Sequence, residues 1–302
     1  MSGNRRGRWL GIDFSGNDRM WTGGCEKSNV WIAFVKRDNQ LTLSDLRTVQ
    51  ELPGPGRPFL KLTALLKNRE FNAAGIDAPF SLPTEYVPLG GHRRLLEAIS
   101  TMERPDGRWF PSARHFTSRM IGERLPELRK PLRETERYWS HRVNVRSTLW
   151  AGPRGGAAMT SVCLTLLHEA QCPIWPWDGP RTAGLLVEAF PAAQLRHWSL
   201  PWQGYSGNAR TAILNRRMIL DFLSEHISIP RPEKRTMLGS ADALDAVICA
   251  FAAIAVTADT VFKPPQPSPL EEGLIAIHER AFGVTRPHNN QQIATVSSVP
   301  TL

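Results

Sequence analysis

Apolar and polar residues follow two different periods in the first quarter of the chain. Short apolar runs and period-two alternation predict three strands. They are expected at residues 8–14, 29–36 and 41–52. The polar turn at 37–40 joins the last two in an antiparallel meander. Residues 58–68 repeat leucines at helical spacing, and the apolar run at 72–78 follows as a buried strand, which is typical of a crossover to a parallel strand.

Residues 79–155 interrupt this regular pattern. They are rich in Pro, Gly and Arg, their apolar periodicity is weak, and we interpret them as an insertion of helices and loops. Regular periodicity then predicts helices at 157–170, 208–226 and 240–259, a strand at 184–190 and a short strand at 271–278. We therefore expect one α/β domain over residues 1–280, with a mixed sheet flanked by helices and a basic insertion at 79–155. A disordered tail is expected at 281–302.

The overall composition is that of a globular chain with a hydrophobic core. Hydrophobic residues make up 41% and charged residues 22% of the 302 positions. The longest apolar stretch, residues 243–256, is shorter than the ~20 residues of a membrane span and contains Asp245. The start of the chain lacks the apolar segment of a signal peptide, and the four cysteines form no C-x-x-C pair. We therefore expect a cytoplasmic protein with free thiols and without a membrane span or a structural zinc site.

The sequence Gly-Ile-Asp occurs twice, ending at Asp13 and at Asp77, each time where a predicted strand ends. Ligands gather at the carboxyl ends of parallel strands, so these two side chains share one crevice if their strands are neighbours. Asp242 and Asp245 lie three residues apart near the start of the last predicted helix, and therefore on one face of it. The opposite face is apolar and is expected to pack on the sheet, which aims both acids at the same crevice. Glu188 lies in a later predicted strand.

Carboxylates that share a crevice repel one another, so at least one must stay protonated unless a cation is present. Magnesium, or manganese in its place, prefers hard oxygen ligands and keeps several waters. Two such ions ~3.5–4 Å apart can hold both the attacking and the leaving oxygen of a phosphoryl displacement. The predicted catalytic residues are Asp13, Asp77, Asp242 and Asp245, and the predicted metal ligands are Asp13, Asp77, Asp245 and Glu188.

Each acid also has an ordinary structural explanation. An aspartate after a strand is often a turn residue that hydrogen-bonds its own backbone, which applies to Asp13 and Asp77. The helix dipole favours an aspartate in a first helical turn, which applies to Asp242. Asp245 is harder to explain in this way because it interrupts an apolar helix. The hypothesis of a metal site therefore depends on the whole set.

Six stretches of the sequence resemble one protein family. They are GIDFSG, GIDAPFSLP, RETER, VEAFPAA, ADALDAVICAFAA and EEGLI, and they span roughly residues 9–277. The chain resembles the domain-of-unknown-function 429 family (DUF429), whose members are predicted to be nucleases of the ribonuclease H-like superfamily. The order of a meander, a crossover helix, a strand ending in an acid and a final helix with two acids is similar to that of RuvC-type resolvases.

The resemblance implies a ribonuclease H-like fold and metal-dependent cleavage of nucleic acid. It matches Asp13 to the first-strand aspartate of the superfamily, and Asp242 and Asp245 to the pair on the last helix. Asp77 stands where the strand-four acid is commonly Glu, so its side chain has a shorter reach. Glu188 matches the VEAFPAA-like strand of the family.

Arginines and aromatic residues are interleaved through the predicted insertion. Together with a formal net charge of +9, this pattern favours a surface that binds phosphates and stacks bases of DNA or RNA. The predicted nucleic-acid-binding residues are Arg133, Arg137, Arg142 and Arg146. Arg133 and Arg137 lie four apart on a predicted helix, where both are placed to face the metal crevice. The competing interpretation is a solvated helical face on which glutamates balance the arginines.

Three functions are open on the sequence alone. The first is a metal-dependent nuclease that cleaves phosphodiester bonds by a two-metal mechanism. The second is an ATP- or nucleotide-binding protein of the actin and sugar-kinase type. GIDFSGND fits that type loosely, although the chain has a single copy of the core and no G-x-x-x-x-G-K-[ST] loop. The third is a catalytically silent scaffold with the same fold. The oligomeric state is also open, with a homodimer as one option.

Overall fold

The computed structural model describes residues 7–104, 107–122, 131–152, 155–265 and 269–279. Its sheet has five strands in the order β3-β2-β1-β4-β5. They are β1 (Gly7–Asp13), β2 (Trp31–Arg37), β3 (Leu41–Thr48), β4 (Ala73–Ile76) and β5 (Leu185–Glu188). The first three form an antiparallel meander, whereas β1, β4 and β5 run parallel to one another. The predicted α/β class with a mixed sheet is confirmed, and β1 lies at the centre of the sheet.

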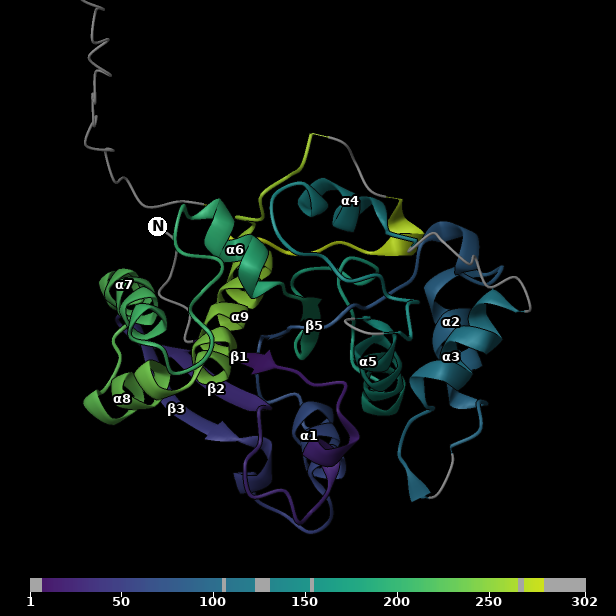
Figure 1. Ribbon diagram of the computed structural model, residues 1–302, viewed down its shortest axis with the longest axis horizontal. Helices are drawn as coiled ribbons and strands as arrows, with labels where there is room; N and C mark the ends of the chain where they lie inside the picture. The colour runs from purple at the N-terminus through teal and green to yellow at the C-terminus, as the bar shows by residue number, and fades with distance from the viewer. Residues whose placement is uncertain (1–6, 105–106, 123–130, 153–154, 266–268, 280–302) are drawn as a thin grey trace, which may run out of the picture.

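Nine α-helices surround the sheet in the described residues (Figure 1). They are α1 (Pro58–Lys67), α2 (Gly91–Ser100), α3 (Ala113–Ile121), α4 (Glu134–Ser140), α5 (Ala157–Ala170), α6 (Pro191–His197), α7 (Arg210–His226), α8 (Arg231–Gly239) and α9 (Ala241–Ala258). The sequence pattern does not predict α6 or α8. Both are short and have proline in the first turn, so no apolar period develops along them.

Hydrophobic clusters cover both faces of the sheet. On one face, Leu10, Ile12 and Ile76 pack with side chains of α1 and α5. On the other face, Trp9 and Ala73 pack with side chains of α7 and α9. The chain therefore forms three layers, with the sheet between two layers of helices, as Figure 1 shows.

Two glycines allow α9 to lie directly on the sheet. An ideal Cβ on Gly11 of β1 would lie 1.9 Å from the carbonyl oxygen of Ala246. An ideal Cβ on Gly75 of β4 would lie 2.0 Å from the carbonyl oxygen of Cys249. Any larger residue at either position would push the helix away, because real Cβ atoms do not approach backbone this closely. The first residue of each Gly-Ile-Asp therefore sets the distance between α9 and the two central strands.

Helix α9 is also the most apolar element. Its 18 residues have a mean hydropathy of 1.8, so by length and composition alone α9 would suffice to cross a membrane. The helix is therefore longer than the apolar stretch at 243–256 that the sequence pattern indicates. The fold buries 72% of it, and buried core helices pass the same test, so this is weak evidence for a membrane span.

The insertion and the C-terminal segment pack beside the sheet. Helices α2 and α3 lie against α5, whereas α4 packs Trp139 against Ile275 and Ile277 of the C-terminal segment. The strand predicted at 271–278 does not form as a regular strand. Leu270–Glu272 is a 3-10 turn, and the residues after it make a single antiparallel bridge between Val261 and His278. The predicted tail at 281–302 lies outside the described residues.

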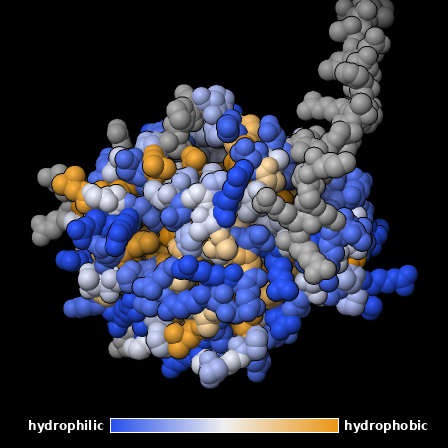
Figure 2. Space-filling view, turned by 180° about the vertical axis from the view of Figure 1, so that it is seen from behind, coloured by the Kyte–Doolittle hydropathy of each residue, from blue (hydrophilic) through white to orange (hydrophobic). Residues whose placement is uncertain are grey.

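Hydrophilic side chains predominate on the face seen from behind, with hydrophobic areas between them (Figure 2). In the described residues, the exposed large hydrophobic side chains are Leu60, Leu89, Ile213, Leu214, Met218 and Leu270. Scattered hydrophobic residues of this kind are normal on a protein surface and do not indicate an interface by themselves.

Candidate active site

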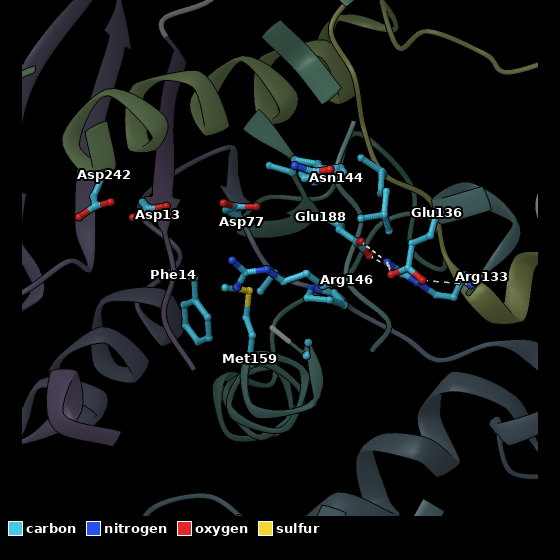
Figure 3. A pocket seen from close by; sticks show the side chains of 18 of the residues that line it. Asp13, Phe14, Asp77, Arg133, Glu136, Asn144, Arg146, Met159, Glu188 and Asp242 are labelled. Carbon is cyan, nitrogen blue, oxygen red and sulfur yellow. Dashed lines mark hydrogen bonds and ion pairs between the residues drawn. The ribbon is translucent and has the colours of Figure 1, made fainter. Parts of the chain in front are cut away.

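Asp13 and Asp77 lie at the carboxyl ends of two neighbouring parallel strands. Ile12 of β1 pairs in register with Ile76 of β4, and the N–H of Asp77 donates to the carbonyl oxygen of Ile12 at 2.9 Å. Because side chains alternate along a strand, both aspartates leave the sheet on the face that α9 covers. Figure 3 shows their carboxylates in one row. The repeated Gly-Ile-Asp therefore brings two carboxylates to one place.

Helix α9 brings two more acids to these strand ends. Ser240 caps the helix by accepting a hydrogen bond from its first turn at 3.2 Å. Asp242 lies in that turn and borders the same cavity as Asp13. Asp245, in the next turn, accepts a hydrogen bond from the hydroxyl of Tyr205 at 3.0 Å. The charge of Asp245 raises the pKa of Asp13, which shows that α9 brings its acidic face toward the strand ends.

Burial raises the pKa values of all four aspartates and is the largest cause for each; nearby carboxylates add to the rise for Asp13, Asp77 and Asp245. The pKa values of Asp13 and Asp245 lie well above the usual range, because other aspartates add to the effect of burial. The pKa of Asp77 is raised to about 7 by burial and then by the charge of Glu188, while Arg146 partly opposes the shift. Near neutral pH the set therefore retains protons unless a cation replaces them.

The aspartates border a cavity of about 310 Å³, which we call the carboxylate cavity; its wall includes Asn29, Asp13, Asp77, Arg146 and Asp242. The buried Oδ1 of Asn29 has no hydrogen-bond partner among the described residues. Magnesium accepts carboxylate and amide oxygens, and it often takes only one or two carboxylates together with water. The described residues contain no group of three or more His, Cys, Asp or Glu side chains arranged to hold a metal ion. Asp13, Asp77 and Asn29 nevertheless line one cavity and carry oxygen atoms of the kind that magnesium or manganese binds.

Glu188 borders the cavity but is directed away from this set. Its position on β5 pairs in register with Ile76, so its side chain leaves the opposite face of the sheet from Asp77. Its two carboxylate oxygens accept hydrogen bonds from Arg133 at 2.5 and 2.8 Å, and one also accepts from the N–H of Phe80 at 2.9 Å. The geometry does not favour the predicted metal-ligand role of Glu188, because Arg133 and the N–H of Phe80 already occupy both of its carboxylate oxygens.

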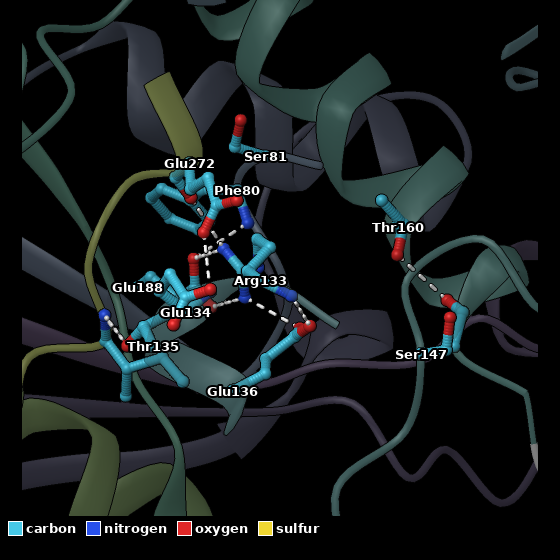
Figure 4. A network of polar contacts seen from close by, with 12 residues as sticks. Phe80, Ser81, Arg133, Glu134, Thr135, Glu136, Ser147, Thr160, Glu188 and Glu272 are labelled. Carbon is cyan, nitrogen blue, oxygen red and sulfur yellow. Dashed lines mark hydrogen bonds and ion pairs between the residues drawn. The ribbon is translucent and has the colours of Figure 1, made fainter. Parts of the chain in front are cut away.

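Arg133 is the centre of a buried ion-pair network (Figure 4). It is 1% exposed and donates to Glu188, to Glu136 at 2.9 Å and to the carbonyl oxygen of Glu272 at 3.1 Å. Only its Nε–H is buried without a partner among the described residues. The prediction that Arg133 binds phosphate from an exposed helical face is therefore wrong. Its guanidinium instead joins α4 of the insertion to β5 and to the C-terminal segment.

A protein-family model described as "Protein of unknown function (DUF429)" matches residues 11–269. The chain belongs to the DUF429 family. No curated protein and no solved structure matches it. The DUF429 match includes Asp13, Asp77, Asp242 and Asp245, so all four aspartates belong to the region that defines the family.

The other three predicted arginines of this DUF429 chain lie in different surroundings. Arg137 is exposed and pairs at 2.5 Å with a glutamate of its own helix, and it does not line the carboxylate cavity. Arg142 lies over the ring of Tyr138, 4.2 Å from its centre. Arg146 is exposed, lines the carboxylate cavity and lowers the pKa of Asp77. Of the four, Arg146 is the exposed arginine that lines the carboxylate cavity.

The sequence pattern misses three polar residues of the DUF429 site. Asn29 and Asn144 line the carboxylate cavity, and Tyr205 donates to Asp245. Its position gives a signal for Asn29, because Asn29 is the first residue of the strand predicted at 29–36, which belongs to the same meander as the strand that ends at Asp13. The start of the second strand of a hairpin lies beside the end of the first. Tyr205 lies in the loop between α6 and α7, where no periodicity indicates a direction.

Proposed function

We propose that this DUF429 protein is a metal-dependent nuclease that hydrolyses phosphodiester bonds of DNA or RNA. The observation that carries the proposal is the pair of carboxylates of Asp13 and Asp77 at adjacent strand ends, with Asp242 and Asp245 of α9 beside them. The pKa values of all four acids rise through burial, and those of three also rise through repulsion by nearby carboxylates, so the site would gain stability from a divalent cation. Carboxylate sites of this kind suit phosphoryl chemistry.

The residues of the carboxylate cavity have distinct proposed roles. Asp13 and Asp77, with Asn29, would hold a magnesium or manganese ion, and the charge of Asp245 would strengthen the binding. A bound cation would stabilise the negative charge that develops on the phosphate in the transition state. Arg146 would contact a non-bridging phosphate oxygen through a charge-assisted hydrogen bond. The two-ion form of the mechanism stays a prediction.

A cleavage panel tests the proposal. Single-stranded, duplex and branched DNA and single-stranded RNA are incubated with magnesium, with manganese or with a chelator. The wild type should cleave at least one substrate with metal and none with chelator. Asp13→Asn should lower the rate by orders of magnitude, because the charge that holds the cation is lost. The control is Asp221→Asn, an exposed aspartate on α7, which should keep wild-type activity.

Three results would contradict the nuclease. The first is an active Asp13→Asn protein in a preparation free of contaminating nuclease. The second is ATP binding at the carboxylate cavity without cleavage, which would favour the actin and sugar-kinase type; the volume of about 310 Å³ lies at the lower end of small-molecule sites. The third is the absence of both activities, which would favour a catalytically silent scaffold.

A further inference from the structure

A second cleft adjoins the carboxylate cavity. It has a volume of about 570 Å³ and lies between the turn at Asp18–Trp21, the start of α3 and the first turn of α5. Three arginines, Arg19, Arg108 and Arg114, line this cleft, and the acid among its lining residues is Asp18. We call it the arginine cleft. Its charge is opposite to that of the carboxylate cavity, in which acids outnumber arginines.

Two of these arginines are available for a ligand. Arg108 forms an ion pair with Asp18 at 2.8 Å, with 42% and 41% of the two side chains exposed. Arg19 and Arg114 are exposed and form no ion pair with any described residue. A surface arginine without a carboxylate partner keeps its full charge and its planar donor group for an oxyanion. The cleft therefore carries a net positive charge that the protein itself does not neutralise.

Backbone donors add to this charge. Ser112 caps α3 by accepting a hydrogen bond from the N–H of His115 at 3.2 Å. The two residues between them, Ala113 and Arg114, are the first of the helix and line the arginine cleft. Their N–H groups have no acceptor within the helix, and the positive end of the helix dipole lies at the same point. Oxyanions bind well to such a combination of arginine and helix start.

The arginine cleft and the carboxylate cavity meet at one contact. Phe14 and Met159 line the carboxylate cavity, whereas Gly16 and Ala158 line the arginine cleft. An ideal Cβ on Gly16 would lie 2.4 Å from the backbone nitrogen of Met159, so the loop after β1 rests directly on the first turn of α5. Figure 3 shows Phe14 and Met159 on the same side of Asp13 and Asp77. Neighbouring residues of the same two segments therefore line both spaces.

A nucleic-acid strand that binds at the carboxylate cavity needs positive charge beside that cavity. A nucleic-acid strand carries one phosphate for about every 3.4 Å of helix rise. A cation among the aspartates can neutralise the phosphate that reacts, but its neighbours would be repelled by the surplus acids of the carboxylate cavity. The nearest phosphates along the strand therefore require positive charge just outside that cavity, and the arginine cleft supplies it.

We infer that the arginine cleft binds the phosphodiester backbone of the substrate strand next to the phosphate that is cleaved. Arg19 and Arg114, with the first N–H groups of α3, contact these phosphates. The inference rests on the proposed function, since it takes the carboxylate cavity as the place of cleavage. It moves the main nucleic-acid contact from the helix around Arg137 to residues that lie on both sides of the insertion boundary.

The test compares the double variant Arg19→Ala/Arg114→Ala with Arg217→Ala/Arg235→Ala. The control arginines are exposed on α7 and α8 and form no ion pair with a described residue, so both variants lose the same charge. Binding of a fluorescein-labelled single-stranded oligonucleotide is followed by anisotropy with chelator at several salt concentrations. The cleft variant should bind roughly tenfold or more weakly, and the slope of log K against log salt should fall by about 1.4. The control should keep both values near those of the wild type.

The variant Arg19→Lys/Arg114→Lys keeps both positive charges and therefore tests whether loss of charge, and not a change in the fold, weakens binding. It should keep the wild-type salt slope, because counterion release follows charge. All variants should melt close to the wild type, since exposed arginines contribute little to stability. Equal losses in the cleft and control variants, or an unchanged salt slope in the cleft variant, would overturn the inference. If the wild type and the cleft variant bind and cleave equally well, the proposed role of the arginine cleft is refuted, whereas the proposed nuclease activity is not. A wild type that neither binds nor cleaves nucleic acid refutes both.

Discussion

Replacing Arg133 by methionine would remove the guanidinium at the centre of the buried network and keep most of the apolar volume. Glu136 and Glu188 are each 3% exposed, so Arg133→Met leaves two buried carboxylates without their cation. The carbonyl oxygen of Glu272 also loses a donor. Removal of one partner from a buried ion pair costs about 3–5 kcal/mol, because the remaining charge stays desolvated. The free energy of unfolding of a domain is about 5–15 kcal/mol, so this loss is a large part of the total stability.

Urea unfolding followed by tryptophan fluorescence would measure this loss, and thermal melting should show a decrease of roughly 6–20 °C in Tm. The matched control is Arg137→Met. Arg137 lies on the same helix, is 59% exposed and pairs with a glutamate at 2.5 Å, so its loss should cost no more than about 1 kcal/mol. An Arg133→Met protein that unfolds within about 1 kcal/mol of the wild type would refute this account of the network.

A second substitution tests whether uncompensated charge is the cause. Glu188→Gln in the Arg133→Met background removes one buried negative charge, and the new amide can still accept from the N–H of Phe80. The double variant should therefore be more stable than Arg133→Met alone, with a coupling of about 1 kcal/mol or more between the two sites. If the effects of the two single substitutions simply add, then Arg133 and Glu188 do not act as a unit.

Three further outcomes follow from the site. Gly75→Ala should destabilise the protein by about 1–3 kcal/mol and lower cleavage, because α9 must move; Gly179→Ala, with open space around it, serves as the control. In metal-free protein, the free energy of unfolding should fall as pH rises from about 4 to about 7. Folded Asp77, with a pKa of about 7, keeps a proton that the unfolded chain releases near its ordinary value of 3.8. Denaturant titrations at several pH values should show this fall, and Asp77→Asn should flatten it. Asp13→Asn should melt at or above the wild-type temperature without metal, since one buried, repelled charge is gone, and should gain less from magnesium. A larger magnesium-induced Tm shift in Asp13→Asn than in the wild type would contradict the assignment of Asp13 as a ligand.

The sequence predicts the strands correctly where apolar and polar residues follow a clear pattern. The alternation at 29–36 and the buried runs at 8–14 and 72–78 lead to β2, β1 and β4 within a few residues, because pattern and burial coincide there. The predicted end of the strand at 41–52 is wrong. β3 stops at Thr48, where Glu51 accepts a hydrogen bond from the N–H of Thr48 at 2.7 Å and the chain turns into a 3-10 helix.

The sequence alone does not predict the roles of residues whose partners lie far away along the chain. Whether Glu188 joins the aspartates depends on the register of β5 against β4, which places it opposite Ile76. A shift by one residue would reverse the face from which its side chain leaves the sheet. Arg133 finds Glu188 at a separation of 55 residues, and nothing in the local sequence around Arg133 indicates that it is buried. Patterns of arginine and glutamate look the same on a solvated helix and in a buried network.

The contact of α9 with Gly11 and Gly75 has a consequence for how the family can vary. The gap between the helix and the strands is set by main-chain atoms, since Cβ positions at both glycines fall on α9 carbonyl oxygens. Substitutions among the apolar side chains of α9 can therefore alter stability without changing how far its acids stand from the strand ends. The glycines have no such freedom. In a library of variants selected for cleavage, substitutions at both glycines should be depleted, although neither glycine would touch the substrate.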